Sequence, residues 1–135
     1  MNVLLAVAWP NHQFHATAKR RLAGSSDRWA TCALTELGFI RLSSNPAAIP
    51  TAKSPQEAAA LLGAMIRDPL HVYFSSLPSP GARNGRTVFA KLLGAKQITD
   101  AYLLWQARRH QAIFVTFDTR LGALADSPSE VEILG

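Results

Sequence analysis

The feature that most constrains the fold is a helical pattern followed at once by a short apolar run, within residues 97–120. The helical part carries an apolar stripe at helical spacing, formed by Ala101, Leu104 and Trp105. We expect the helix to start at Asp100, with Thr99 as its cap. It should end near residues 109–110, where basic side chains suit the negative end of the helix dipole.

The apolar run, residues 112–115, is rich in β-forming side chains and is typical of a strand buried on both faces of a parallel sheet. The helix carries the chain roughly 15 Å away at about 1.5 Å per residue. The strand and its exit return it roughly 20 Å at about 3.3 Å per residue. Because the connection is short, helix and strand should pack antiparallel, which brings Asp100 and Asp118 to the same end of the sheet.

That end, at the carboxyl termini of the strands, is where α/β proteins bind ligands. Two acids brought together repel each other, so the arrangement indicates a divalent cation. Taken singly, each acid also has a structural explanation. Asp100 favours a helix N-terminus, and Asp118 favours a turn.

A third acid, Glu36, occupies a similar place. Residues 30–33 are expected to form a brief strand, and residues 34–42 a helix with Glu36 in its first turn. Glu57 is excluded from the site because it forms a capping box with Ser54. The remaining strands are expected at 72–74 and 131–134, and the remaining helices at 12–22, 55–67, 87–93 and 121–125, whereas residues 3–9 fit either element. Strands alternating with helices predict an α/β fold with a parallel sheet.

Composition fits one globular domain over residues 1–135, with 48% hydrophobic and 17% charged residues. The net charge of +5 favours a polyanionic partner. A single cysteine, Cys32, excludes an internal disulfide, fits a reducing compartment and is expected to be a buried structural thiol. Residues 3–9 are too few to span a bilayer and follow no cation, so we expect a cytoplasmic protein without a membrane partner.

Several stretches closely resemble PIN-domain ribonucleases of the VapC type, the toxins of type II toxin-antitoxin systems. They are residues 29–42 (WATCALTELGFIRL), 98–104 (ITDAYLL) and 115–118 (VTFD), together with the opening residues 2–6 and 9–12. The resemblance implies a three-layer α/β/α fold, a Mg²⁺ or Mn²⁺ cofactor and RNA as the substrate. It also implies a cognate antitoxin protein that blocks the site, and a homodimer.

Carried over position by position, the resemblance gives roles to four residues. Glu36, Asp100 and Asp118 match the second, third and fourth acids of the family and are its expected metal ligands. Thr116 matches a hydroxyl position near the metal.

The chain departs from the family at its opening. There the first strand, central in the family's sheet, ends in Asp-x-Asn, and here Asn2 matches the Asn and Met1 the middle position. The family's first Asp and first strand are therefore missing, and the alignment makes residues 3–9 a helix. We favour a start placed too late over a truncated relative, because losing a central strand would expose the apolar faces of its neighbours.

The predicted function is metal-assisted hydrolysis of RNA, with the acids holding the ion and Glu36 binding metal or orienting the water. One alternative is a catalytically impaired module that binds antitoxin or RNA without cleaving it. Another is a small nucleotide-binding α/β protein, although the chain has no Gly-rich phosphate loop. The four histidines lack the spacing of a zinc site and are expected at the surface or at helix ends: His12, His15, His71 and His110.

Overall fold

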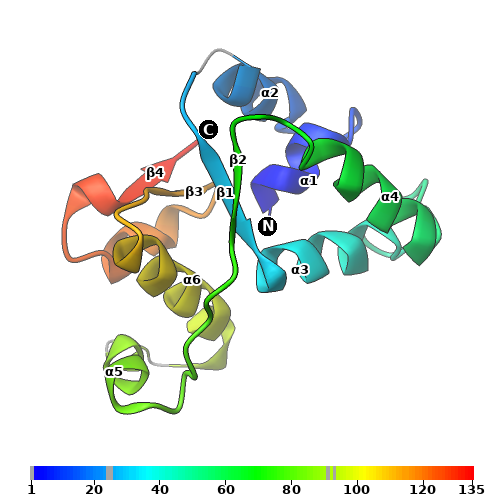
Figure 1. Ribbon diagram of the computed structural model, residues 1–135. Helices are drawn as coiled ribbons and strands as arrows, with labels where there is room; N and C mark the ends of the chain where they lie inside the picture. Colours follow the sequence, from blue (N-terminus) through cyan, green and yellow to red (C-terminus); the bar gives the residue numbers. More distant parts are fainter. Residues whose placement is uncertain (1, 24–25, 91, 93) are drawn as a thin grey trace. The chain divides into compact units, whose positions relative to one another are not determined.

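A computed structural model of the chain describes residues 2–23, 26–90, 92 and 94–135 (Figure 1). The chain divides into two compact units, Met1–Ser75 and Ser76–Gly135. Met1, which was matched to the family's opening motif, lies outside the described residues.

The first unit contains helices and one parallel strand pair. Its elements are α1 (Asn2–Ala8), α2 (His15–Ala23), β1 (Trp29–Cys32), α3 (Ala33–Ser43), α4 (Pro55–Met65) and β2 (His71–Phe74). Residues 2–8 are helical, which is the choice that the alignment made and that periodicity alone left open. Because α2 begins at His15, it starts later than the predicted helix over 12–22.

The core of this unit lies between α1, α3 and α4. It contains Leu5, Trp9, Phe39 and Leu62, and Phe39 has no exposed surface. The Ser54–Glu57 capping box predicted from the sequence opens α4, with the Glu57 N–H donating to Ser54 Oγ at 3.1 Å. These apolar contacts position α3, the helix that carries Glu36.

In the second unit, one long helix packs beside another parallel strand pair. Its elements are α5 (Arg83–Arg86), η1 (Thr87–Phe89), η2 (Ala95–Gln97), α6 (Ile98–Arg109), β3 (Phe114–Thr116), η3 (Thr119–Leu124), η4 (Pro128–Glu130) and β4 (Val131–Ile133). Of the predicted helix over 87–93, residues 87–89 form the 3₁₀ turn η1, and α5 precedes it; residues 91 and 93 lie outside the described residues. Helix α6 begins at Ile98 rather than Asp100, because η2 runs straight into it without a side-chain cap from Thr99.

A left-handed residue ends α6. Gln111 has φ 53°, its N–H donates to the Arg108 carbonyl at 3.1 Å, and the Ala112 N–H donates to the Ala107 carbonyl at 2.8 Å. This pair of bonds is a Schellman motif, which satisfies carbonyls that a helix end would otherwise leave unpaired. The motif delays the strand, so β3 covers Phe114–Thr116 instead of 112–115.

All the described strand pairs are parallel, as predicted. β1 pairs with β2 and β3 pairs with β4, so each unit has its own two-stranded sheet. Cys32, at the end of β1, is buried as expected. None of the described helices has the length and apolar character needed to cross a membrane.

Candidate functional site

Asp100 and Asp118 lie near each other in the second unit. Asp100 is in the first turn of α6, and Asp118 follows β3 and caps η3. Asp100 is half-buried, and its pKa is raised by burial and further by the negative charge of Asp118. A carboxylate whose ionised form is disfavoured in this way is typical of functional sites.

Two neighbours fix Asp118. The Arg120 guanidinium donates from Nε to Oδ1 at 3.0 Å and from Nη2 to Oδ2 at 2.9 Å, and the Arg120 backbone N–H also donates to Oδ1. These bonds hold the pKa of Asp118 below its usual range. The Thr116 hydroxyl, which is buried at the end of β3, accepts the backbone N–H of Asp118 at 3.0 Å. Thr116 therefore orients the turn from which Asp118 projects.

Glu36 belongs to the first unit, in the first turn of α3. Its Oε1 accepts a hydrogen bond of 2.7 Å from the hydroxyl of Thr31, a buried residue of β1. The same hydroxyl oxygen lies 2.8 Å from Nε2 of His71 on β2. The meeting of Glu36 with Asp100 and Asp118 stays a prediction.

Sequence reasoning missed three of these neighbours: Thr31, His71 and Arg120. His71 was expected at the surface or at a helix end; it is partly buried, lies on a strand and bonds to Thr31. Alternation of side chains along a strand could have placed His71 on the same face as Tyr73, but it could not have given Thr31 as its partner. Arg120 could have been found as the residue two positions beyond an acid at a turn, where an Asx turn brings the two together.

The chemistry of the acids suits a hard cation, because carboxylate oxygens are the ligands that Mg²⁺ and Mn²⁺ prefer. Within neither unit do three or more His, Cys, Asp or Glu side chains of the described residues gather into a metal-holding group. Among the described residues of the second unit, the candidate ligands near each other at this site are Asp100 and Asp118.

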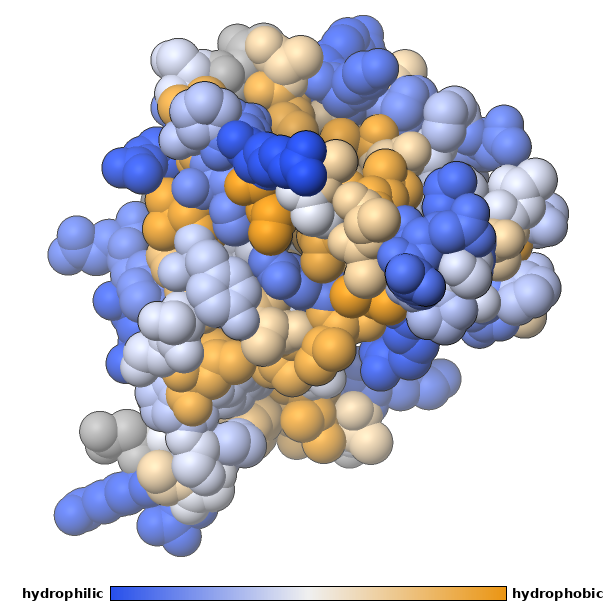
Figure 2. Space-filling model, turned by 45° about the vertical axis from the view of Figure 1, so that its right-hand side comes forward, coloured by the Kyte–Doolittle hydropathy of each residue, from blue (hydrophilic) through white to orange (hydrophobic). Residues whose placement is uncertain are grey.

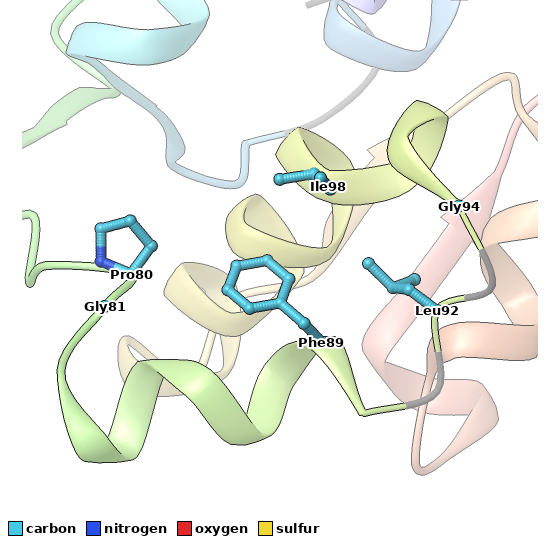
Figure 3. Close-up of a pocket in the computed structure, with 6 residues that line it drawn as sticks. All are labelled: Pro80, Gly81, Phe89, Leu92, Gly94 and Ile98. Carbon is cyan, nitrogen blue, oxygen red and sulfur yellow. The ribbon is translucent and has the colours of Figure 1, made fainter.

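An apolar cavity of about 550 Å³ lies beside the start of α6. Figure 3 shows the Phe89 ring among the side chains of Pro80, Leu92 and Ile98, and Gly81 and Gly94 complete the lining. Ile98 precedes Asp100 by one helical half-turn, and its side chain is 47% exposed. Figure 2 shows further apolar residues on the surface. Leu37 on α3 in the first unit is 61% exposed, and Ile113 in the second unit is 55% exposed.

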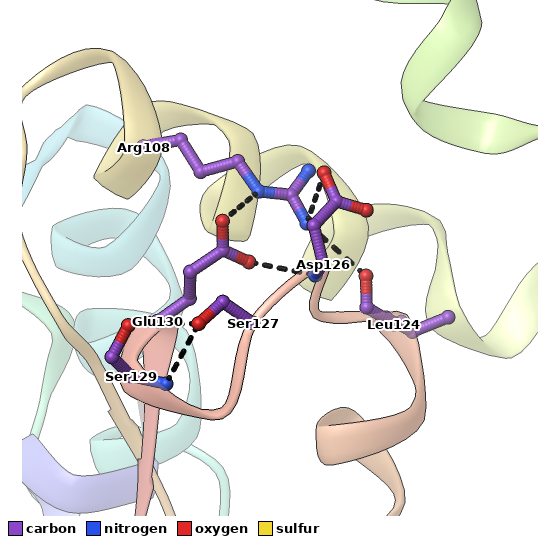
Figure 4. Close-up of polar contacts among 6 residues, drawn as sticks. All are labelled: Arg108, Leu124, Asp126, Ser127, Ser129 and Glu130. Atoms are coloured by element: carbon purple, nitrogen blue, oxygen red, sulfur yellow. Dashed lines mark hydrogen bonds and ion pairs between the residues drawn. The ribbon is translucent and has the colours of Figure 1, made fainter.

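At the far end of α6 a charge cluster ties down the C-terminal segment (Figure 4). Arg108 Nε donates to Glu130 Oε1 at 3.0 Å, and its Nη2 donates to the Leu124 carbonyl at 3.2 Å. The same guanidinium lies 3.5 Å from an oxygen of Asp126. Because η4 leads into β4, this cluster anchors the strand that pairs with β3 and supports the turn at Asp118.

Comparison with known proteins shows that the chain matches a protein family and several of its members. The model of the PIN domain family matches residues 2–127. Ribonuclease VapC39 of Mycobacterium tuberculosis is 37% identical over 142 aligned residues, which cover 99% of this chain and 96% of that protein. Ribonuclease VapC38 of the same organism is 33% identical, covering 99% of this chain and 94% of that protein. Ribonuclease VapC44 is 35% identical over 93% of this chain and 87% of its own length.

The helices and parallel strands described above fit the three-layer α/β/α fold of this family. The resemblance predicted from the sequence is thereby confirmed. By the extent of the match and the identity of its relatives, this chain belongs to the PIN-domain family and is of the VapC type.

Proposed function

We propose that this chain is a metal-dependent ribonuclease, which hydrolyses RNA phosphodiester bonds and acts as the toxin of a toxin-antitoxin pair. The observation that carries the proposal is the pair of acids in the second unit, where half-buried Asp100 is held near Asp118. Two like charges kept together cost free energy unless a cation lies with them. The relatives named as ribonucleases support the choice of RNA as substrate.

Mg²⁺ or Mn²⁺ is the proposed cofactor. Asp100 and Asp118 would hold the ion, and Glu36 is the proposed third acid, which binds metal or orients the attacking water. A bound divalent cation makes water easier to deprotonate and offsets negative charge on the leaving oxygen.

Neighbouring groups orient Asp118 and affect the ionisation of Asp118 and Asp100. Thr116 fixes the backbone at Asp118, and the Arg120 guanidinium holds that carboxylate in its ionised form. The N-terminal end of α6 attracts negative charge, which favours the ionised form of Asp100. In Asp100 this attraction opposes the effect of burial.

RNA, a cognate antitoxin protein and a second copy of the chain are the proposed partners. The net charge of +5 suits a polyanionic substrate. Membership of the VapC type supports the antitoxin and the homodimer as proposed partners.

Cleavage of a synthetic RNA by the purified chain tests the proposal. With Mg²⁺ or Mn²⁺ present, the wild type should cleave, whereas Asp100→Asn and Asp118→Asn should lose at least about 100-fold in rate. Asp126→Asn is the matched control, since this acid of the same unit lies in the charge cluster at the far end of α6. Undiminished cleavage by Asp100→Asn, or equal cleavage in excess chelator, would refute the assignment.

A second candidate is a module that binds antitoxin or RNA without cleaving it. It is favoured by one observation, that both oxygens of Asp118 already accept bonds from Arg120. Calorimetric titration with Mn²⁺ separates the two functions, because the binding module should give no heat of metal binding.

A further inference from the structure

The hydroxyl of Thr31 has two polar partners in the first unit. Its Oγ1 lies 2.7 Å from Glu36 Oε1 and 2.8 Å from His71 Nε2. Thr31 is 3% exposed, so its hydroxyl is shielded from bulk water, whereas Glu36 and His71 are partly buried. Hydrogen bonds to a charged group in such surroundings are stronger than neutral bonds at the surface.

The direction of the bonds follows from the chemistry of the three groups. A hydroxyl has one hydrogen, and an ionised carboxylate can only accept. The Thr31 hydrogen therefore goes to Glu36, and the contact with His71 requires a hydrogen on Nε2. This holds for the neutral ring and for the protonated ring alike, since Nε2 can carry hydrogen in both. The three groups therefore form a series of hydrogen bonds with one direction: Nε2–H of His71 donates to Oγ1 of Thr31, and the Thr31 hydroxyl donates to Oε1 of Glu36.

Strand pairing places the His71 ring. His71 is aligned with Trp29 across the β1–β2 pair, and the two rings lie 4.6 Å apart between centroids. The Trp29 indole N–H donates to Asp68 Oδ2 at 3.0 Å, and the His71 backbone N–H donates to the Asp68 carbonyl at 2.9 Å. The ring is thus placed by Trp29 on β1 and by Asp68, which bonds both to Trp29 and to the backbone of His71.

We propose that His71 and Thr31 are positioning residues, which hold one carboxylate oxygen of Glu36 in a fixed direction for the reaction. The inference rests on the proposed function, in which Glu36 acts on the metal or the water. A glutamate side chain loses rotamer freedom when it is ordered, and this loss costs free energy. If the hydrogen bonds from His71 through Thr31 order the Glu36 side chain before substrate binds, the acid is already oriented when the RNA arrives.

The bond pattern can be tested in the free protein, without activity. Nitrogen-15 NMR of the full chain should show His71 with hydrogen on Nε2, and this hydrogen should exchange slowly with water. Thr31→Val keeps the shape of the side chain but removes the hydroxyl, so exchange should become fast. A wild-type ring that carries hydrogen only on Nδ1, or an exchange rate that Thr31→Val leaves unchanged, would overturn the inference.

Kinetics test the positioning role. His71→Leu and Thr31→Val should each lower kcat by about 10- to 100-fold with little change in KM, as expected for groups that orient a functional side chain. His71→Gln can present an amide N–H near the position of Nε2, and Thr31→Ser keeps the hydroxyl, so both should restore much of the rate. Because the two residues act through one chain, the double variant His71→Leu, Thr31→Val should be no slower than the slower single variant.

Two comparisons separate this inference from the proposed function. Tyr73→Phe is the matched control, since Tyr73 lies opposite Thr31 in the strand pair and is 47% exposed; its kcat should not change. If Glu36→Gln leaves RNA cleavage unchanged, the role of Glu36 fails, while NMR still decides the bond pattern. If Glu36→Gln abolishes cleavage but folded His71→Leu and Thr31→Val keep the wild-type kcat, the positioning role is overturned.

Discussion

The guanidinium of Arg120 bonds to both carboxylate oxygens of Asp118, at 3.0 Å from Nε to Oδ1 and 2.9 Å from Nη2 to Oδ2. A two-point ion pair of this kind occupies the oxygens that a metal ion would need. The Arg120 side chain is 70% exposed, so it can leave Asp118 without disturbing a core.

We therefore expect Arg120→Gln to tighten Mn²⁺ binding about tenfold, or about 1.4 kcal/mol, in calorimetric titration. Arg120→Lys keeps the charge but loses the planar fork, so its affinity should lie between those of the wild type and Arg120→Gln. Arg109→Gln removes an equal charge at the other end of α6 and should have little effect. Equal affinity in the wild type and in Arg120→Gln would contradict competition for Asp118.

Ionised Asp100 should destabilise the fold. Its pKa in the folded protein is raised, by burial and by Asp118, above the unfolded value of 3.8. The folded state therefore binds the proton more tightly, and stability falls as pH rises from the unfolded pKa through the folded one. Without added metal, Asp100→Asn should melt at a higher temperature than the wild type at pH 7, and the difference should vanish near pH 3. A difference in melting temperature that does not vary with pH would rule out this origin.

The bond from Arg108 to Glu130 should stabilise the second unit near neutral pH. It lowers the pKa of Glu130 below the usual 4.5, so its contribution is present above pH 4.5 and is lost as pH falls through the folded pKa. Both side chains are about one-quarter exposed. Glu130→Gln should therefore cost about 1 kcal/mol in denaturant unfolding at pH 7, and less in acid. Asp126→Asn, at a side chain 65% exposed and 3.5 Å from Arg108, should cost less than about 0.5 kcal/mol.

Glycine should be the better residue at the end of α6. Gln111 has φ 53°, a left-handed conformation that costs an L-residue about 1–2 kcal/mol and costs glycine nothing. Gln111→Gly should therefore raise the unfolding free energy by about 1 kcal/mol in thermal or denaturant unfolding. His110→Gly is the control, because φ at that position is −103° and glycine there should destabilise. A loss of stability in Gln111→Gly would show that its side chain makes a compensating contact.

The local pattern of the sequence was enough to locate the acids. Glu36 and Asp100 were predicted in the first turns of helices, and Asp118 just past a strand, and all three lie there. This succeeds because helix starts and strand ends are set by residues a few positions apart. The predicted start of α6 was wrong by two residues, since a preceding 3₁₀ turn replaced the cap expected from Thr99.

The neighbours of the acids could not be predicted in the same way. Thr31 and His71 lie 40 positions apart, and their contact depends on how β1 aligns with β2. Periodicity assigns a residue to a strand but does not state which residue of another strand it will face. The left-handed Gln111 was also missed, because the sequence offers no glycine or asparagine there to signal it.

The orientation of the Glu36 carboxylate depends on whether β1 and β2 pair in the correct register when the protein folds. Side chains alternate between the faces of a strand, so a slip of one residue would turn His71 away from Thr31. Such a molecule would keep its sequence and most of its helices, yet Glu36 would lose the support that His71 gives it through Thr31. Mispaired molecules would thus be a slower subpopulation, chemically identical to the competent ones and distinguishable only by their conformation and their lower kcat.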